Sequence, residues 1–116
     1  MNANFLALIE VIEKLRSSNG CPWNLEQDLL SMRPYLLEET FELLETLDLA
    51  LPITKYDNNN QLLCEELGDL LFVILLLAQI AEDQGRFSKQ DCFEKITKKM
   101  IVRHPHLFQK NHEGIN

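Results

Sequence analysis

The apolar run from Leu70 to Ala78 constrains the fold of this chain more than any other feature, because all nine of its residues are hydrophobic. A membrane-spanning helix needs about 18 apolar residues, so the run predicts a buried helix of a globular protein. A helix that is apolar on every side must also be covered on every side. The other helices available to a chain of 116 residues are too short to do this alone. We therefore predict a homo-oligomer, a dimer or a larger assembly, with this helix in the shared core.

The spacing of the apolar residues predicts four helices, and no stretch shows the alternation of a β-strand. The expected helices run from about residue 4 to 16, from 34 to about 52, from about 61 to 84, and from 88 onward. Together they predict a single all-α domain over residues 1–110. Residues 111–116 are polar and are expected to form a frayed tail.

Turn and capping residues mark the ends of these helices. Pro34 suits the first turn of the second helix, and Gly85 suits the C-terminal cap of the third. Ser88, with Asp91 three residues later, is typical of a capping box that opens the fourth. Two connections are expected to be irregular, namely residues 21–24 and the polar loop at residues 56–60.

Charge and cysteine content narrow the class of protein. The formal net charge is −7, whereas proteins that bind nucleic acid usually carry a basic excess, so we expect no nucleic-acid partner. Cys21, Cys64 and Cys92 are widely spaced and form no C-x-x-C pair, which predicts reduced thiols in the cytoplasm. The N-terminus lacks the basic region of a signal peptide. Because the apolar run is also too short to span a bilayer, we expect no membrane partner.

Acidic and basic residues are segregated along the chain. Residues 34–54 contain five acids, residues 56–85 contain six, and neither stretch contains Lys or Arg. Residues 86–110 instead contain seven basic residues and two acids. An acidic helix is usually a solvated face, but such faces commonly carry cations four residues along. No cation stands at that position for any of the following acids: Glu38, Glu39, Glu42, Glu66 and Asp69.

Two acidic pairs have the spacing of a metal site. Glu39 and Glu42 are three residues apart, as are Glu66 and Asp69, and residues so spaced lie about 60° apart on a helix. If the second and third helices pack antiparallel, the two pairs face each other. Carboxylates at close range repel unless a cation is bound or some are protonated. An all-oxygen site suits Mg²⁺, or Mn²⁺ in its place, but the spacing alone leaves a solvated face possible and identifies no substrate.

Five sequence blocks follow one another over nearly the whole chain. They are Cys21-Pro22-Trp23 with Gln27, Arg33 to Glu39 with Glu42, Cys64 to Leu71, Ala78 to Ala81, and Arg103 to Phe108. Together they resemble the MazG nucleoside triphosphate pyrophosphohydrolases. The resemblance implies a MazG-like four-helix bundle with a dimeric core, which hydrolyses an NTP or dNTP to the monophosphate and pyrophosphate. It also implies that four residues bind Mg²⁺ and act in catalysis: Glu39, Glu42, Glu66 and Asp69.

Further residues are candidates for catalysis and phosphate binding. Glu38 lies beside the expected ligands and could orient or deprotonate the attacking water, although a solvent-facing role fits its position equally well. Lys95, Lys99 and Arg103 form a cationic stripe at i, i+4 and i+8. The resemblance implies that Lys99 and Arg103 contact the triphosphate, and the alternative is a solvated basic face. Arg33 is another candidate for phosphate binding.

Trp23 and Gln27 are candidates for contacts to the base. Trp23 follows a proline in a segment expected to be irregular, where its ring can stack on a base, although a lone Trp often belongs to a core. Gln27 could read a base edge. His104 and His106 lack the i, i+4 spacing of a helical zinc pair, so we expect them to be structural.

Departures from the family pattern leave the preferred base open. Asn24 stands where the family commonly has Asp, and Asp28-Leu29 replaces its usual Thr-His. Many relatives carry a second, similar domain, and because this chain ends where the first would end, contacts from a second domain are expected to be absent.

Two other functions remain as alternatives. One is a sister reaction on the same scaffold, with dUTP or phosphoribosyl-ATP as the substrate. The other is a catalytically silent helical interaction module, whose acidic face would dock a basic partner. For the pyrophosphohydrolase itself, house-cleaning of aberrant nucleotides and control of nucleotide pools are both compatible with the sequence.

Overall fold

The part of the chain that the structure describes is built from helices. The computed structural model describes residues 2–49 and 58–108. The helices, in chain order, are α1 (Ala3–Leu15), α2 (Pro22–Glu26), α3 (Arg33–Leu49), α4 (Asn58–Asp83), α5 (Lys89–Arg103) and α6 (Pro105–Phe108). No strand occurs among these residues. The prediction of an all-α fold is confirmed.

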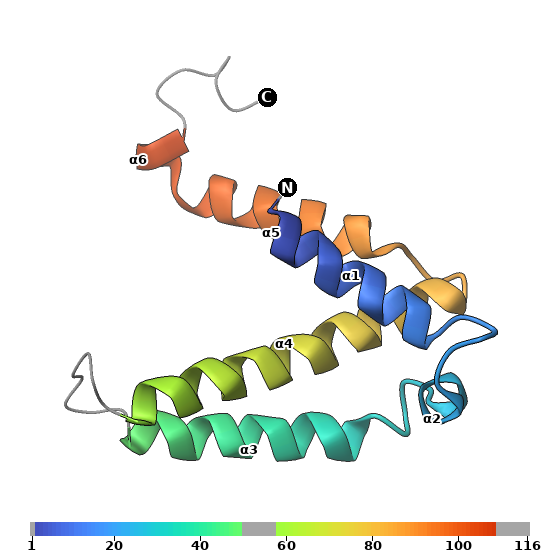
Figure 1. The fold of residues 1–116 in the computed structure, drawn as a ribbon. Helices are drawn as coiled ribbons and strands as arrows, with labels where there is room; N and C mark the ends of the chain where they lie inside the picture. Colours follow the sequence, from blue (N-terminus) through green and yellow to red (C-terminus); the bar gives the residue numbers. More distant parts are fainter. Residues whose placement is uncertain (1, 50–57, 109–116) are drawn as a thin grey trace.

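The helices form two arms that meet near the C-terminal end of α4 (Figure 1). In one arm α3 and α4 run antiparallel and pack along each other. In the other arm α1 and α5 contact α4 and then lead away from α3. The Cα radius of gyration is 17.4 Å, whereas a compact chain of this length has about 13 Å. A single chain is therefore more open than a closed four-helix bundle.

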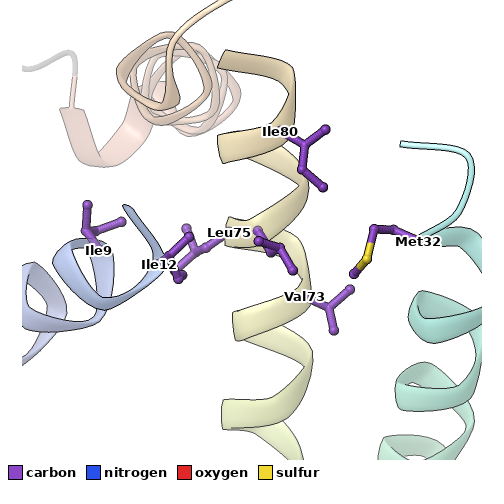
Figure 2. Packing of buried hydrophobic residues seen from close by; sticks show 7 residues of the cluster. Ile9, Ile12, Met32, Val73, Leu75 and Ile80 are labelled. Atoms are coloured by element: carbon purple, nitrogen blue, oxygen red, sulfur yellow. The ribbon is translucent and has the colours of Figure 1, made fainter. Parts of the chain in front are cut away.

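The hydrophobic core lies where the two arms meet, with α4 at its centre. Figure 2 shows Ile9 and Ile12 of α1 on one side of α4, and Met32, directly before α3, on the other. The rings of Phe5 in α1 and Phe93 in α5 lie beside this core with centroids 5.8 Å apart. The buried members of the core are Ile9, Ile12, Met32, Val73, Leu75, Leu76 and Ile80. Burial of each such side chain contributes about 1.5–3 kcal/mol to the stability of the fold.

The apolar run from Leu70 to Ala78 is only partly covered within one chain. Val73 and Leu76 are buried, whereas Leu71 and Ile74 are 40% and 49% exposed. One side of this stretch of α4 therefore faces solvent in the single chain. Among the described residues, no helix has the length and apolar character needed to cross a membrane.

A buried lysine fixes the second arm to α4. Nζ of Lys89 lies 2.5 Å from Oε1 of Gln79, 3.2 Å from Oε2 of Glu82 and 3.4 Å from Oε2 of Glu13. The Lys89 side chain is only 6% exposed. Lys89 is the buried partner, whereas the side chains of Glu82 and Glu13 are 35% and 50% exposed. A buried charge that loses its partners is costly. These contacts therefore hold α1, α4 and α5 in one arrangement.

Several helix ends follow the capping rules that the sequence suggested. Pro34 lies in the first turn of α3. Gly85 follows α4 with a φ of +73°, a conformation that favours glycine because it has no Cβ. Ser88 caps α5, with Asp91 completing a reciprocal capping box at N···O distances of 2.9 and 3.2 Å. All three expectations are confirmed.

Some boundaries differ from the expectation. Residues 21–24 were expected to be irregular, but most of them belong to α2, because Pro22 fixes φ and lacks the N–H that a first turn leaves unpaired. α6 begins at Pro105 for the same reason. Residues 58–60 form the first turn of α4 and not part of a loop. The expected end of the second helix near Pro52, residues 56–57 and the tail at residues 111–116 lie outside the described residues.

Candidate metal centre

The four residues expected to bind metal come together between α3 and α4. Each offers one carboxylate oxygen, and these four oxygens all lie within 4.8 Å of one another. The residues are Glu39 and Glu42 of α3 and Glu66 and Asp69 of α4, and we call them the acidic cluster. The spacing of three turns both members of each pair to one side of their helix. The antiparallel packing of α3 on α4 then brings the two pairs face to face (Figure 1).

Burial leaves two oxygens of the acidic cluster without hydrogen-bond partners. Oε2 of Glu39 and Oε2 of Glu66 are buried and contact no donor among the described residues. Loss of water raises the pKa of Glu39, and the negative charges of Glu42 and Asp69 raise it further. The pKa of Glu66 is also raised, first by loss of water and then by the charge of Glu42 and a hydrogen bond to it. A buried, ionised oxygen costs free energy unless a cation or a donor meets it.

Among the residues that the structure describes, no Lys, Arg or His forms an ion pair with this cluster. The ion pairs in the described part of the chain join Arg16 to Asp83 and Lys89 to both Glu13 and Glu82. These pairs lie where α1 and α5 meet the end of α4, away from the acidic cluster (Figure 1). Four carboxylates, of which Glu39 and Glu66 each carry a buried oxygen with no partner among the described residues, fit a divalent cation. An all-oxygen donor set suits Mg²⁺ or Mn²⁺ better than zinc.

Glu38 lies at the rim of the acidic cluster. Its side chain is exposed. Its negative charge adds to the effects of burial, Glu42 and Asp69 that raise the pKa of Glu39, so it lies close enough to act on the cluster electrostatically. This position gives Glu38 access to water, which is compatible both with a role in catalysis and with a purely solvent-facing glutamate.

Trp23 is held against the start of α3 by an aromatic contact that sequence reasoning missed. Its ring meets that of Tyr35 edge to face, with centroids 5.2 Å apart and planes 87° apart. Both rings are partly open to solvent, Trp23 by 42% and Tyr35 by 39%. Tyr35 precedes Glu39 by four residues, so the two lie on one face of α3 about 6 Å apart along its axis. This i, i+4 spacing was the feature of the sequence from which Tyr35 could have been predicted to lie near the acidic cluster.

The amide of Gln27 is used within its own segment. Nε2 donates to the carbonyl oxygen of Trp23 at 3.0 Å, and Oε1 accepts from the hydroxyl of Ser31 at 2.8 Å. Arg33 begins α3 and lines an open, mainly apolar hollow with Leu30 and Leu37. Arg33 lies about 120° around the helix from Glu39, so it does not share the face that carries the acidic cluster.

The cationic residues of α5 are not brought to the acidic cluster within one chain. Lys99 and Arg103 are exposed, and α5 leads away from α3 on the other arm (Figure 1). Their contact with a triphosphate therefore stays a prediction. At the end of α5, Nδ1 of His104 lies 2.7 Å from the carbonyl oxygen of Met100, and the rings of His104 and His106 are 6.0 Å apart. These contacts fit the structural role expected of the two histidines.

Comparison with known proteins identifies the family. The pattern of the MazG nucleotide pyrophosphohydrolase domain matches residues 27–108, a stretch that contains the whole acidic cluster. The chain belongs to the MazG family. A MazG relative from Thermotoga maritima, named nucleoside triphosphate pyrophosphohydrolase/pyrophosphatase MazG, is 40% identical over 104 residues, which are 90% of this chain and 38% of that protein.

Two further relatives of the MazG family carry the name nucleoside triphosphate pyrophosphohydrolase. The protein from Escherichia coli is 41% identical over 102 residues, 87% of this chain and 36% of its own length. The protein from Mycobacterium tuberculosis is 40% identical over 99 residues, 84% of this chain and 27% of its own. The chain therefore spans between about a quarter and two fifths of the length of these relatives.

Proposed function

We propose that this MazG domain hydrolyses nucleoside or deoxynucleoside triphosphates to the monophosphate and pyrophosphate, using Mg²⁺, or Mn²⁺, bound by the acidic cluster. The observation that carries the proposal is the convergence of four carboxylate oxygens within 4.8 Å. Two of these residues have a buried oxygen that finds no partner in the described part of the chain. The names of the relatives point to the same reaction.

The residues around the acidic cluster suggest which of them act on the phosphates, on the water and on the base. A divalent cation bound there supplies charge neutralisation for phosphate oxygens and lowers the pKa of a water. Water is added across the anhydride bond between the α- and β-phosphates: its oxygen joins phosphorus, and the bridging oxygen leaves with the other product. In this proposal Glu38, which is exposed beside Glu39, orients that water and accepts its proton. Trp23 and Tyr35 offer partly open rings for the base, and Tyr35 lies about one helical turn from Glu39 on α3.

A second copy of the chain would complete both the core and the site. Leu37, Phe41 and Leu44 form an apolar stripe on α3 at i, i+4 and i+7, and they are 59%, 57% and 51% exposed. This stripe and the exposed side of the apolar run on α4 are apolar surfaces that a homodimer or a higher oligomer would bury. In such an assembly α5 of one copy can approach the acidic cluster of the other, which gives Lys99 and Arg103 a route to the triphosphate.

A substrate panel tests the proposal directly. The protein is incubated with the common NTPs and dNTPs, with dUTP and with phosphoribosyl-ATP, each with Mg²⁺, and pyrophosphate is measured separately from orthophosphate. Release of pyrophosphate with the monophosphate is expected, and orthophosphate as the first product would refute the cleavage position. The preferred substrate then distinguishes a general NTP pyrophosphohydrolase from the two sister reactions.

The alternative of a silent interaction module is tested by thermal melting with and without Mg²⁺. A specific site stabilises the fold as the cation concentration rises past its dissociation constant. A solvated acidic face gives only a weak response that other salts reproduce. The cytoplasm is the compartment we propose, because Cys21, Cys64 and Cys92 are all free thiols.

A further inference from the structure

We propose that Arg16 is a positioning residue for nucleotide binding, whose guanidinium holds the Trp23 segment (residues 21–31) so that the Trp23 ring stays beside Tyr35. The proposal rests on the proposed function, in which this aromatic pair contacts the base. Arg16 itself touches no part of the substrate and acts through the backbone of the segment.

The Arg16 side chain connects three parts of the molecule. Nη1 donates to the carbonyl oxygens of Asn24 and of Gln27, the latter at 2.9 Å. Nε donates to Oδ2 of Asp83, the last residue of α4, at 3.1 Å. The side chain is only 10% exposed, so water competes little for these bonds. Hydrogen bonds with an ionised partner are about twice as strong as neutral ones, so Arg16 ties the Trp23 segment firmly to α4.

The short helix α2 depends on such ties for its position. Five residues are too few for a helix to be stable by itself, and the last carbonyls of a helix have no partners within it. Arg16 supplies donors and a positive charge at this end, where a cation is favourable. At the other end, Cys21 N–H donates to the Leu15 carbonyl at 3.0 Å. Gly20 passes so close to α1 that a Cβ there would lie 2.3 Å from the Lys14 carbonyl oxygen.

The orientation of Arg16 is itself fixed by the hydrogen bonds that hold its partner Asp83. Nε2 of Gln79 donates to Oδ1 of Asp83 at 2.9 Å, and Oε1 of the buried Gln79 accepts from Lys89. The guanidinium therefore cannot turn away from the two carbonyls without breaking a connected polar network in the interior. The contact of Gln79 with Asp83 thus also helps to set where Trp23 lies. A ring held in advance binds a base at a lower cost in entropy than a mobile one.

Trp23 is the single tryptophan of the chain, so its fluorescence reports on this segment alone. Arg16→Met removes every donor and keeps an apolar stem, whereas Arg16→Lys restores the charge and one donor group. We expect acrylamide to quench Trp23 more strongly in Arg16→Met than in the wild type, with Arg16→Lys between them. KM for the NTP should rise about tenfold in Arg16→Met while kcat changes much less. The melting shift caused by Mg²⁺ should stay as in the wild type.

Glu13→Gln is the matched control, because it breaks another ion pair at the same junction, 3.4 Å from Lys89, without touching the Trp23 segment. Quenching and KM should match the wild type in this variant. Equal changes in Glu13→Gln, or unchanged quenching and KM in Arg16→Met, would overturn the proposal. If circular dichroism shows Arg16→Met to be unfolded, quenching and KM of Arg16→Lys are compared with those of Glu13→Gln and the wild type instead. If the wild type hydrolyses no NTP, the proposed function fails, while quenching still shows whether Arg16 holds Trp23.

Discussion

Glu39 on α3 and Glu66 on α4 face each other with carboxylate oxygens no more than 4.8 Å apart, and each also carries a buried Oε2 that meets no donor within the described ranges. Without a metal, two carboxyl groups this close repel each other and destabilise the folded chain unless at least one is protonated. With a cation between them, the same two carboxylates stabilise the folded chain.

Replacing Glu39 with Gln should stabilise the metal-free protein at neutral pH and abolish its response to Mg²⁺. The substitution removes a desolvated negative charge from the cluster and also removes a ligand. We expect the melting temperature in a chelator to rise by a few degrees, and the further rise on adding Mg²⁺ to disappear. Glu45→Gln, an exposed acid on the same helix, is the control and should behave like the wild type in both conditions. A lower melting temperature for Glu39→Gln in the chelator would contradict the account.

The stabilising effect of Glu39→Gln should depend on pH. The pKa of Glu39 is raised above its ordinary value of 4.5, chiefly by burial. Below 4.5 both the folded and the unfolded wild type keep this proton, so no stability is lost. Stability is lost as the pH rises through the raised pKa, because the folded chain must then bear the charge. The difference in melting temperature between variant and wild type should therefore be small near pH 4.5 and grow toward neutral pH. A difference in melting temperature that does not change with pH would argue against a raised pKa of Glu39 as its cause.

Asp69→Asn should remove hydrolysis without removing the fold. Replacing a residue that only supports a metal ligand typically lowers metal affinity by about 10- to 100-fold. Loss of a ligand itself should therefore lower kcat/KM by at least about a hundredfold. Pyrophosphate release measures the loss, and helicity by circular dichroism should match the wild type. Glu65→Gln changes an exposed acid on the same helix and should keep full activity. Comparable losses in both variants would mean that net charge, and not the acidic cluster, governs the rate.

Phe41→Glu should dissociate the proposed oligomer. Phe41 is 57% exposed at the middle of the apolar stripe on α3, and a charge there cannot be buried against a second copy without a large cost. Light scattering should show a smaller assembly for this variant than for the wild type. Val11→Glu introduces the same charge at a similarly exposed apolar site on α1 and should leave the assembly intact. A wild type that is monomeric at micromolar concentration would remove the inference.

Mixing two inactive variants should restore part of the activity if α5 of one copy serves the acidic cluster of another. Glu39→Gln damages the cluster, and Arg103→Ala damages the cationic residue proposed to reach it. After unfolding and refolding in equal amounts, a mixed dimer has one site in which both parts are intact. About a quarter of the wild-type activity is then expected for a symmetric dimer. Activity that stays at the level of the separate variants would place Arg103 and the cluster in the same chain or exclude Arg103 from the site.

The long helices and the acidic cluster could be predicted because their signals are local. A spacing of three within each pair fixes which face of a helix carries the acids, and the absence of cations at i+4 showed that the acids are not compensated there. Only the antiparallel packing of α3 on α4 had to be assumed. The MazG resemblance then supplied the ligand role, which the geometry of the cluster supports and the metal experiments have yet to test.

The remaining features depend on contacts that leave no periodic signal. Arg16 binds carbonyl oxygens 8 and 11 residues away, and any residue type at those positions supplies the same carbonyl. The partners of Gln27 lie within its own segment, so its amide gave no sign of being occupied. The spacing of Lys99 and Arg103 predicted a stripe, but the direction in which α5 leaves α4 determines what the stripe can reach.

The acidic cluster draws its residues from two helices joined by a single connection, and Glu42 and Glu66 are only 24 positions apart in the sequence. A cation bound by both helices is therefore a reversible cross-link that closes one loop of the chain. Unlike a disulfide, such a link exists only while both helices are folded, so it stabilises the hairpin by an amount that grows with the cation concentration. A chelator undoes this link without touching a covalent bond. The supply of magnesium would then set how long the hairpin of α3 and α4 survives a protease, as well as how fast nucleotides are cleaved.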